Sequence, residues 1–528
     1  MVYKLKIRRK IVAWLCLGTV AITGCGGIAP DRNDLSVAEE AKSEHGKKET
    51  PPVSLGFSQE FTYQVLPMKT SVKVNQIGYE PSREKIAVFE NAAVDAEFEV
   101  IEYKTGETVY TGRIKGSQQS EEDDISFSYG DFTSFNQEGT FCIRTEGIGY
   151  SYPFVIREKL YDGLFQDALK QFYFSRCGTS LPEEYAGESA RNACHTSLAK
   201  LQEDMKSEKD VTGGWHTDEK GNRSVLMGCN TMQTLLLAYE IHPEVFGDDT
   251  LIPEREDQIP DLLNELQYEA QWLLKMQDET TGGVYDGVRT TDYGNGNMYS
   301  YIQPVSVATS LCYAAAMAKF SYVYQNYDNQ FATMCLRAAD RAIRYAKHYP
   351  EELDEGLLFQ AAVELYRATG QISYRNDVDA YLISHTSFDM EDDAVFQACT
   401  TYLLCKQRVN ISYCDMMITN LMKYVERLST QSRDLTYLAA DHTSEKGTVF
   451  DMLRSAQRMV VVNYVITNSE YDRLLLNYTH YFLGCNEEAL CYVGQYGTHN
   501  AMDVGKDAGI MNQAETDALW IMLLSDIQ

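Results

Sequence analysis

Two different patterns of hydrophobic and polar positions divide this chain. Between residues 69 and 157, short apolar runs alternate with turn signals, as in Phe98, Val100 and Ile101 followed by the turn at residues 104–107. Strands at this spacing indicate a small β-sandwich. From residue 158 onward, apolar residues recur every three or four positions, which indicates amphipathic helices. The change of period predicts two structural domains that meet near residue 157.

The second region predicts a mainly helical domain. A proline and an acidic residue, Pro260 and Asp261, open its clearest run, and both are favoured at a helix N-terminus. About a dozen helices with no strand signal between them are typical of a toroid or solenoid of helical hairpins. The clearest predicted helices cover residues 259–274, 306–327, 331–348, 355–369, 394–405, 412–428, 450–465, 471–482 and 513–525.

The N-terminus has the pattern of an export signal. Basic residues between positions 4 and 10 precede an apolar run at residues 11–22, which is too short to span a bilayer permanently. The run ends in Gly24-Cys25, which resembles a bacterial lipobox and predicts a lipoprotein signal peptide over residues 1–24, with Cys25 as the lipidated residue. The alternative is an ordinary signal peptide with an incidental cysteine. The lipobox predicts a protein anchored by lipid to the extracellular face of a bacterial cell membrane.

The composition of the chain predicts a linker and excludes some classes of binding partner. Residues 25–66 are polar and charged, which predicts a flexible linker ahead of domains at residues 67–157 and 158–528. Of the 528 residues, 47 are Lys or Arg and 76 are Asp or Glu, a net charge of −29. This balance argues against nucleic acid, and against any membrane contact beyond the lipid anchor. The 13 cysteines are scattered along the chain, so we expect few disulfides.

Two short segments carry a family resemblance. Residues 213–220 read Gly-Gly-Trp-His-Thr-Asp-Glu-Lys, and residues 511–514 read Met-Asn-Gln-Ala. They resemble the two catalytic segments of the family 9 glycoside hydrolases, the cellulase family. The resemblance implies an (α/α)6 barrel over residues 158–528, preceded by an immunoglobulin-like β-sandwich that opens with residues 74–81. Further matching segments lie at residues 172–178, 185–187, 193–196, 235–240, 259–261, 272–277, 282–285, 304–306, 364–370 and 482–486.

The resemblance fails where the family places its carboxyl groups. The family reads Asp-Ala-Gly-Asp after the Gly-Gly-Trp-His segment, and Asn-Glu-Val-Ala in the second. Here Thr217 and Lys220 occupy the two Asp positions, and Gln513 occupies the Glu position. Inverting hydrolysis needs one carboxylic acid and one carboxylate across the cleft. Gln cannot supply the proton, and neither Thr nor protonated Lys can accept one. The resemblance therefore implies an inverting endo-β-1,4-glucanase scaffold with impaired chemistry.

Nearby acids could replace the missing groups. A shift of one residue would bring Asp218 or Glu219 near the position of the lost base. Glu515 lies two residues beyond Gln513, and a helix would rotate its side chain by about 200° to another face. Solvated surface acids are the alternative for all three residues.

The resemblance also suggests residues that contact substrate. Trp215, Tyr285 and Asp286 are the substrate-binding candidates, although the family usually has His where Asp286 stands. Gln360 aligns with an aromatic sugar platform. The segment of residues 498–511 is shorter than the family's sugar-contacting loop and lacks its His-His-Arg sequence.

A metal site is a separate prediction. Cys177, Cys194, His195 and His216 would offer two thiolates and two imidazoles, a set that suits tetrahedral zinc. The resemblance strengthens this interpretation, because some bacterial members carry a structural zinc on this pattern. The alternative is two buried thiols and two polar loop histidines. Four protein ligands would make the zinc structural, with no open position for catalysis.

Three functions remain open at this stage. The first is a catalytically impaired surface protein kept for glycan binding or assembly. The second is a working glycanase with relocated carboxylates or an unusual substrate. The third is a structural lipoprotein that binds no sugar. For the first two, the resemblance makes a polysaccharide of the β-glucan class the expected partner.

Overall fold

The computed structural model describes residues 70–119, 125–218, 220–292, 298–440, 449–494, 496–502 and 513–528. The predicted signal peptide, Cys25 and the predicted linker lie outside these residues. Glu219 and Asn512 also lie outside them, as does most of the segment before Asn512.

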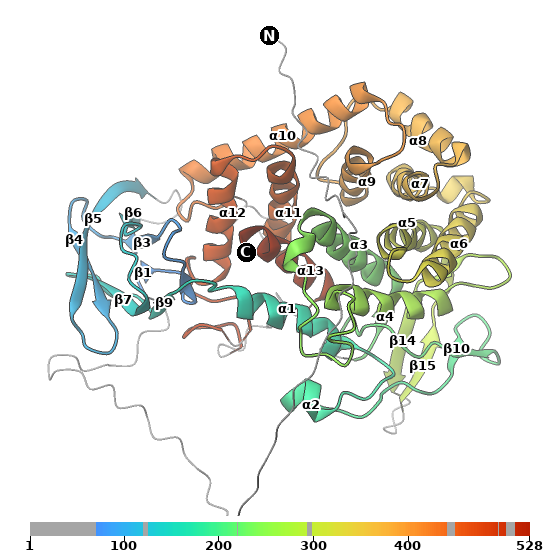
Figure 1. Ribbon diagram of the computed structural model, residues 1–528, viewed down its shortest axis with the longest axis horizontal. Coiled ribbons are helices and arrows are strands. Elements are labelled where there is room, and N and C mark those ends of the chain that lie inside the picture. The colour runs from blue at the N-terminus through green and yellow to red at the C-terminus, as the bar shows by residue number, and fades with distance from the viewer. Residues whose placement is uncertain are drawn as a thin grey trace, which may run out of the picture. The chain divides into compact units, whose positions relative to one another are not determined.

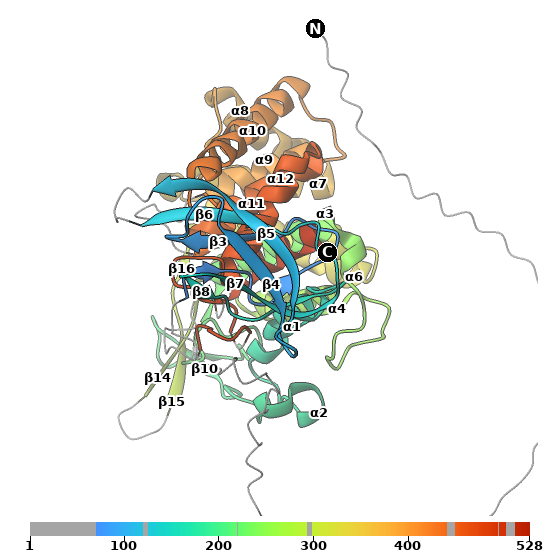
Figure 2. The same cartoon turned by 90° about the vertical axis from the view of Figure 1, so that its left-hand side faces the viewer.

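The first domain is a β-sandwich (Figure 1, blue; Figure 2). Its strands pair in the order β1-β3-β6-β5-β4-β7-β9-β2, with β8 on β7. The strands are β1 (Val72–Lys73), β2 (Gly78–Tyr79), β3 (Ile86–Glu90), β4 (Glu97–Glu102), β5 (Thr108–Gln119), β6 (Ser126–Asp131), β7 (Gly139–Thr145), β8 (Gly149–Tyr150) and β9 (Phe154–Ile156).

Strand β5 joins the two halves of the sandwich. Its first part pairs with β4 and its last part with β6, and its register with β6 shifts between Lys115 and Gln118. Gly116 lies in this irregularity with a φ of 68°, a conformation that glycine adopts without strain. The change of partner falls between Arg113 and Ile114, just before this bulge, so one strand contributes to both halves around an apolar core that includes Phe98, Val100 and Ile143.

The second domain is an (α/α)6 barrel, so the predicted fold class is confirmed (Figure 1). Its inner helices are α3 (Val225–Ile241), α5 (Val307–Tyr324), α7 (Glu355–Thr369), α9 (Asp393–Leu404), α11 (Val449–Val465) and α13 (Ala514–Ile527). Its outer helices are α1 (Asp162–Ser175), α4 (Asp261–Lys275), α6 (Asn329–Ala346), α8 (Ile372–Ser384), α10 (Ile411–Asp434) and α12 (Ser469–Phe482). A single-turn helix, α2 (Glu183–Ala186), lies in a loop.

The sequence explains which helices lie inside. Inner helix α5 is buried on nearly every face, and it packs against α3, α7 and outer helix α6. Helix α6 buries one stripe of small and apolar residues and exposes charged residues on its other face. Despite the apolar character of α5, no helix in the described part of the chain is long and apolar enough for a bilayer span.

The expectation of no strands between the helices is wrong. A five-stranded sheet lies in the loops of the barrel, in the order β11-β10-β15-β14-β12, and a second small sheet pairs β13 with β16. Most of these strands have only two or three residues, and the β10–β15 and β12–β14 pairings join distant parts of the chain, so local periodicity gives little signal for them. The neighbouring strands β14 and β15 are the exception, because they are longer and pair with each other. They are β10 (Ala199–Leu201), β11 (Glu208–Lys209), β12 (Arg223–Ser224), β13 (Val284–Tyr285), β14 (Gly287–Asp292), β15 (Met298–Ile302) and β16 (Val305–Ser306).

Among the inner-helix starts that the structure describes, four have a side-chain cap. At each start, a Ser or Asp oxygen accepts a hydrogen bond from the backbone N–H three residues later, as N-cap residues do. Because the inner helices run in one direction, these starts lie together at one end of the barrel, called here the mouth. The caps are Ser224 on α3, Ser306 on α5, Asp354 on α7 and Asp392 on α9.

Charged side chains link the inner helices within the barrel core. The Arg367 guanidinium of α7 lies 2.6 Å from Glu240 Oε1 of α3 and 2.7 Å from Glu364 Oε2 of its own helix. Lys319 of α5 is fully buried, and its Nζ lies 3.6 Å from Glu364 Oε1. Burial lowers the pKa of Lys319, and the two glutamates oppose that shift. The group ties α3, α5 and α7 together.

The described cysteines fit the expectation of few disulfides. All eleven that the structure describes are free thiols. Cys312, Cys335 and Cys399 are fully buried in helices, where cysteine acts as a small apolar residue.

Gln76 of the sandwich forms several hydrogen bonds with the barrel. Its backbone N–H donates to Leu483 O (2.9 Å), and its side-chain amide donates to Ala489 O (2.7 Å). Its Oε1 accepts from the backbone N–H groups of Thr498 and His499, each at 2.9 Å. One buried glutamine therefore satisfies several backbone groups of the loop that follows α12.

His480 lies in the same interface and makes the stability of the fold depend on pH. Asn75 Nδ2 donates to its Nδ1 at 3.0 Å. Burial, with the charge of Arg83, lowers the pKa of His480 to about 3, whereas an unfolded histidine has a pKa of about 6.5. The unfolded state therefore takes up this proton first as the pH falls, so stability is lost between pH 6.5 and pH 3.

We expect this residue to lower the free energy of unfolding by about 2 kcal/mol between pH 7 and pH 5. Urea unfolding of the wild type and of His480→Asn at both pH values measures the contribution. The decrease should be smaller by this amount in the variant. The same pH dependence in both proteins would contradict the assignment.

Candidate functional site

The Gly-Gly-Trp segment is held by packing. Gly214 has a φ of 77°, and a Cβ atom there would lie 2.5 Å from the Trp272 ring. The backbone N–H of Trp215 donates to Glu269 Oε2 at 2.8 Å, and the Trp215 side chain is only 1% exposed. Trp215 therefore anchors the segment in the core, and its indole has no face open to a sugar.

The loop after Trp215 is closed on itself. Thr217 donates both its N–H (2.7 Å) and its hydroxyl (3.0 Å) to Asn222 O. The Asp218 carboxylate accepts from the backbone N–H groups of Lys220 and Asn222 and from the Asn222 amide. Partial burial opposes ionisation, but the hydrogen bonds from Asn222 outweigh it, and the pKa of Asp218 is lowered. Asp218 is thus an ionised loop-closing group, and Lys220 is exposed.

The four predicted metal ligands lie together beside this loop. The ligand atoms of Cys177, Cys194, His195 and His216 all lie within 4.8 Å of one another. The two Sγ atoms are 3.9 Å apart, Cys177 Sγ is 3.6 Å from His195 Nδ1, and Cys194 Sγ is 3.4 Å from His216 Nε2. Tetrahedral zinc with its usual bond lengths would place neighbouring ligand atoms about 3.3–3.8 Å apart. The residues present therefore fit this metal.

The backbone directs these ligands. His195 has a φ of 48°, in the left-handed region, which lets its ring turn towards the same point as the Sγ atom of the preceding Cys194. A Cβ atom on Gly221 would lie 2.4 Å from His195 Cε1, so glycine leaves room for the ring. Arg191 Nη1 lies 3.2 Å from Cys194 Sγ and places a positive charge beside that sulfur.

The start of α13 holds the other predicted site residues. Gln513 is the exposed N-cap of the helix. Glu515 is half-buried, and its Oε1 accepts from Asn230 Nδ2 of α3 at 2.9 Å. Burial, with the nearby Asp393 carboxylate, raises the pKa of Glu515. Asp517 lies one turn beyond Gln513, and burial raises its pKa well above the usual value. This helix start therefore carries two carboxyl groups whose pKa values are raised.

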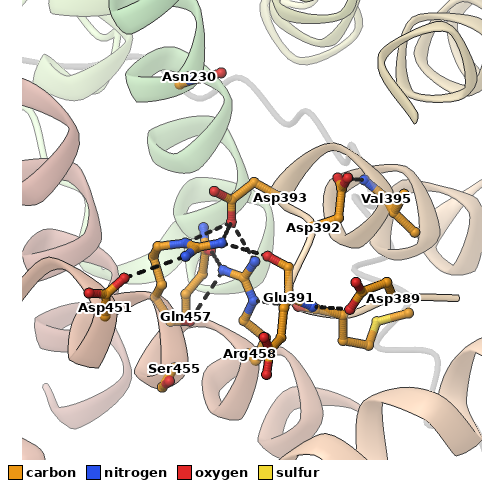
Figure 3. A network of polar contacts seen from close by, with 12 residues as sticks. Asn230, Asp389, Glu391, Asp392, Asp393, Val395, Asp451, Ser455, Gln457 and Arg458 are labelled. Atoms are coloured by element: carbon orange, nitrogen blue, oxygen red, sulfur yellow. Dashed lines mark hydrogen bonds and ion pairs between the residues drawn. The ribbon is translucent and has the colours of Figure 1, made fainter. Parts of the chain in front are cut away.

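A charged network at the mouth was not predicted. Asp393, the first residue of α9, accepts from Arg454 Nε at 3.0 Å and from Arg458 Nη2 (Figure 3). Burial opposes ionisation of Asp393, but the two arginines outweigh it and lower its pKa. Arg458 also donates to Gln457 Oε1 at 2.8 Å. The pair Asp392-Asp393 before an apolar run is an N-cap signal that could have drawn attention to this position.

The remaining substrate-binding candidates form hydrogen bonds with other residues of the protein. The Tyr285 hydroxyl donates to Asp278 Oδ2 at 3.0 Å, and the Tyr285 side chain is 8% exposed. Asp286 Oδ1 accepts from the hydroxyls of Ser306 and Thr309, both at 2.5 Å, and so braces the start of α5. Gln360 is buried, and its amide donates to Gln233 Oε1 at 2.6 Å.

The predicted site residues fall into two groups, those at the mouth of the barrel and those buried in its walls. The Gly-Gly-Trp loop leads into α3, and Asn230 of α3 contacts Glu515 of α13, so the helices that follow the two family segments meet at the mouth. Trp215, Tyr285 and Asp286 instead support the walls. A β-sandwich ahead of an (α/α)6 barrel with these segments at its mouth defines the architecture of a cellulase-type glycoside hydrolase.

Comparisons with known proteins agree with this architecture. The family model "Glycosyl hydrolase family 9" matches residues 161–515, and "Cellulase N-terminal ig-like domain" matches residues 68–150. The chain is 26% identical to "Xyloglucan-specific endo-beta-1,4-glucanase BoGH9A" of Bacteroides ovatus, over 81% of each chain. It is 27% identical to "Endoglucanase D" of Acetivibrio thermocellus, over 82% of this chain and 74% of that one. The solved structure "Bacteroides ovatus GH9" superposes with a TM-score of 0.78 at 21% identity, over 87% of this chain and 98% of that one.

The chain therefore belongs to glycosyl hydrolase family 9.

Proposed function

We propose that this protein binds β-glucan at the mouth of its barrel and has lost most of the hydrolytic activity of its family. The observation that carries the proposal is the set of residues at the family's carboxyl positions, Thr217, Lys220 and Gln513. The substrate class follows from the relatives, which are named as a xyloglucan-specific endo-β-1,4-glucanase and an endoglucanase.

The contacts of the loop support the loss of a base. The Thr217 hydroxyl is bonded to Asn222 O, and the neighbouring Asp218 carboxylate is occupied by three donors of its own loop. A carboxylate stabilised in this way is a weaker proton acceptor. Positioned proton transfer contributes about 10²–10⁴-fold to rate, so losing both acid and base removes most of the catalysis.

A second candidate function is hydrolysis by relocated carboxyl groups. Glu515 has a raised pKa and Asp393 a lowered one, and both lie at the starts of inner helices at the mouth. Two carboxyl groups whose environments push their pKa values apart are a common arrangement for an acid and its partner. Against this candidate, Asp393 Oδ1 is already bound by two arginines.

Activity assays separate the two candidates. We expect wild-type protein to release no reducing sugar above background from xyloglucan or soluble cellulose derivatives, while affinity electrophoresis detects binding to at least one of them. The matched variants are Glu515→Gln and, as a control on the exposed helix α2, Glu183→Gln. Hydrolysis by the wild type that is lost in Glu515→Gln but retained in Glu183→Gln would establish the second candidate. Absence of both hydrolysis and binding would overturn both.

We further propose that Cys177, Cys194, His195 and His216 hold one structural zinc ion. The ligand spacing and the soft thiolate and imidazole donors support this proposal. Because His216 directly precedes Thr217, a metal at this point would fix the loop that borders the mouth.

Purified protein should contain about one equivalent of zinc, measured by mass spectrometry without added metal. Chelation should lower the melting temperature by roughly 5–10 °C, because the ion binds only the folded state. Cys194→Ser should lose the metal, whereas Cys414→Ser, outside the cluster, should retain it. A wild-type content well below one equivalent would refute the site.

We also propose that the protein is anchored through a lipid on Cys25 at the extracellular face of a bacterial membrane. The basic residues, the short apolar run and Gly24-Cys25 support this proposal. Cys25→Ala should release the protein from membranes or leave its precursor uncleaved, as seen by fractionation and by a shift in mass. Cys16→Ala, within the apolar run, should behave as wild type. Normal processing and fractionation of Cys25→Ala would exclude the anchor.

A further inference from the structure

A second pocket lies at the end of the barrel opposite the mouth. It has a volume of about 250 Å³ and is lined by residues near the C-terminal ends of α7 and α9, by α8 and by the start of α10. Tyr366 of α7 and Tyr402 of α9 form its inner wall, and Ile383 of α8, which is 75% exposed, borders its opening. None of the predicted catalytic, substrate-binding or metal-binding residues lines this pocket, although Tyr366 belongs to the matching segment of residues 364–370.

The pocket concentrates positive charge in an acidic protein. Its lining includes the guanidinium groups of Arg375 and Arg408 and the single carboxylate of Asp379. Arg375 Nε lies 3.5 Å from Asp379 Oδ2. The Arg408 side chain is exposed and has no hydrogen-bond or ion-pair partner among the described residues. Two arginines against one carboxylate leave a local excess of positive charge, although the chain carries −29 overall.

Two tyrosines give the pocket a fixed shape and a hydrogen-bond donor. The Tyr366 hydroxyl donates to Arg408 O at 2.8 Å and so positions the loop that carries Arg408. The Tyr402 oxygen accepts from the Asn410 N–H at 2.8 Å. Burial raises the pKa of Tyr402 to about 12, so its hydroxyl keeps a proton that it can donate.

We propose that this pocket binds a hexuronate unit, a sugar ring that carries a carboxylate. Guanidinium groups pair with carboxylates in fork geometry, so the ligand needs an anionic end. Asp379 would repel a simple anion but accepts hydrogen bonds from hydroxyl groups, so the ligand also needs hydroxyl donors. The volume lies below that of typical drug-sized sites, which favours a single ring. The choice of a sugar over another hydroxylated acid rests on the proposed glycan-binding function.

Titration with sodium glucuronate, glucose and inorganic phosphate, followed by calorimetry or ligand-observed NMR, tests the site in the whole protein. We expect glucuronate to bind with a Kd near about 1 mM, and glucose and phosphate to bind at least about tenfold more weakly. Arg408→Gln should weaken glucuronate binding about tenfold, because one hydrogen bond between charged groups contributes that much. Arg113→Gln, an exposed arginine on the sandwich, is the matched control.

Each outcome bears on the proposal. Selective glucuronate binding that is lost in Arg408→Gln and kept in Arg113→Gln supports it. Equal binding of phosphate, equal binding by Arg408→Gln and the wild type, or no glucuronate binding overturns it. The melting temperature of Arg408→Gln should match the wild type, because the side chain has no partner among the described residues to lose. Binding of neutral β-glucan at the mouth should be unchanged in this variant, so the two proposals fail independently.

Discussion

The ion group in the barrel core is the constraint on which the arrangement of the inner helices depends. Arg367 spans Glu240 and Glu364, and Lys319 adds a second cation with no solvent around it. Removing one member of a buried set leaves an uncompensated charge, which typically costs about 3–5 kcal/mol. The three helices must therefore keep their relative positions. Because the group lies in the C-terminal halves of these helices, it fixes their spacing towards the end of the barrel opposite the mouth.

On the proposed function, the contacts around the mouth explain how the family fold can be kept without the family's carboxyl groups. Three sets of hydrogen bonds hold the residues around the mouth. Glu269 accepts from the Trp215 N–H, Asp286 accepts from Ser306 at the start of α5, and Asp218 accepts from Asn222 within its own loop. None of these supports depends on the residues at positions 217, 220 and 513 being acids. Substitution at those positions changes the proton chemistry of the mouth, while the walls keep the contacts that fold them.

The sequence predicts this fold well where the cause is local and less well where it is long-range. The strand-to-helix change of period and the family segments predict both domains. The two Cys and two His residues, together with the family resemblance, indicate a group that does lie together. The sheet formed by residues 199–302 was not predicted, because most of its strands are very short and two of its pairings join distant parts of the chain, although β14 and β15 are sequence neighbours. Burial of Trp215 and the arginines around Asp393 depend on tertiary contacts that no single segment encodes. Glu515 was predicted in part. Helix geometry predicts that its side chain points away from that of Gln513, but it does not predict the hydrogen bond with Asn230.

The fit of Gly214 against the Trp272 ring bears on how such families are recognised. A side chain at this position would collide with the indole, so selection for a stable fold is enough to retain the glycine. This glycine can therefore be kept for packing, whether or not the chain carries out the reaction of its family. Recognition by this segment reports a shared architecture, and enzymatic competence has to be judged from the few acids that stand beside it.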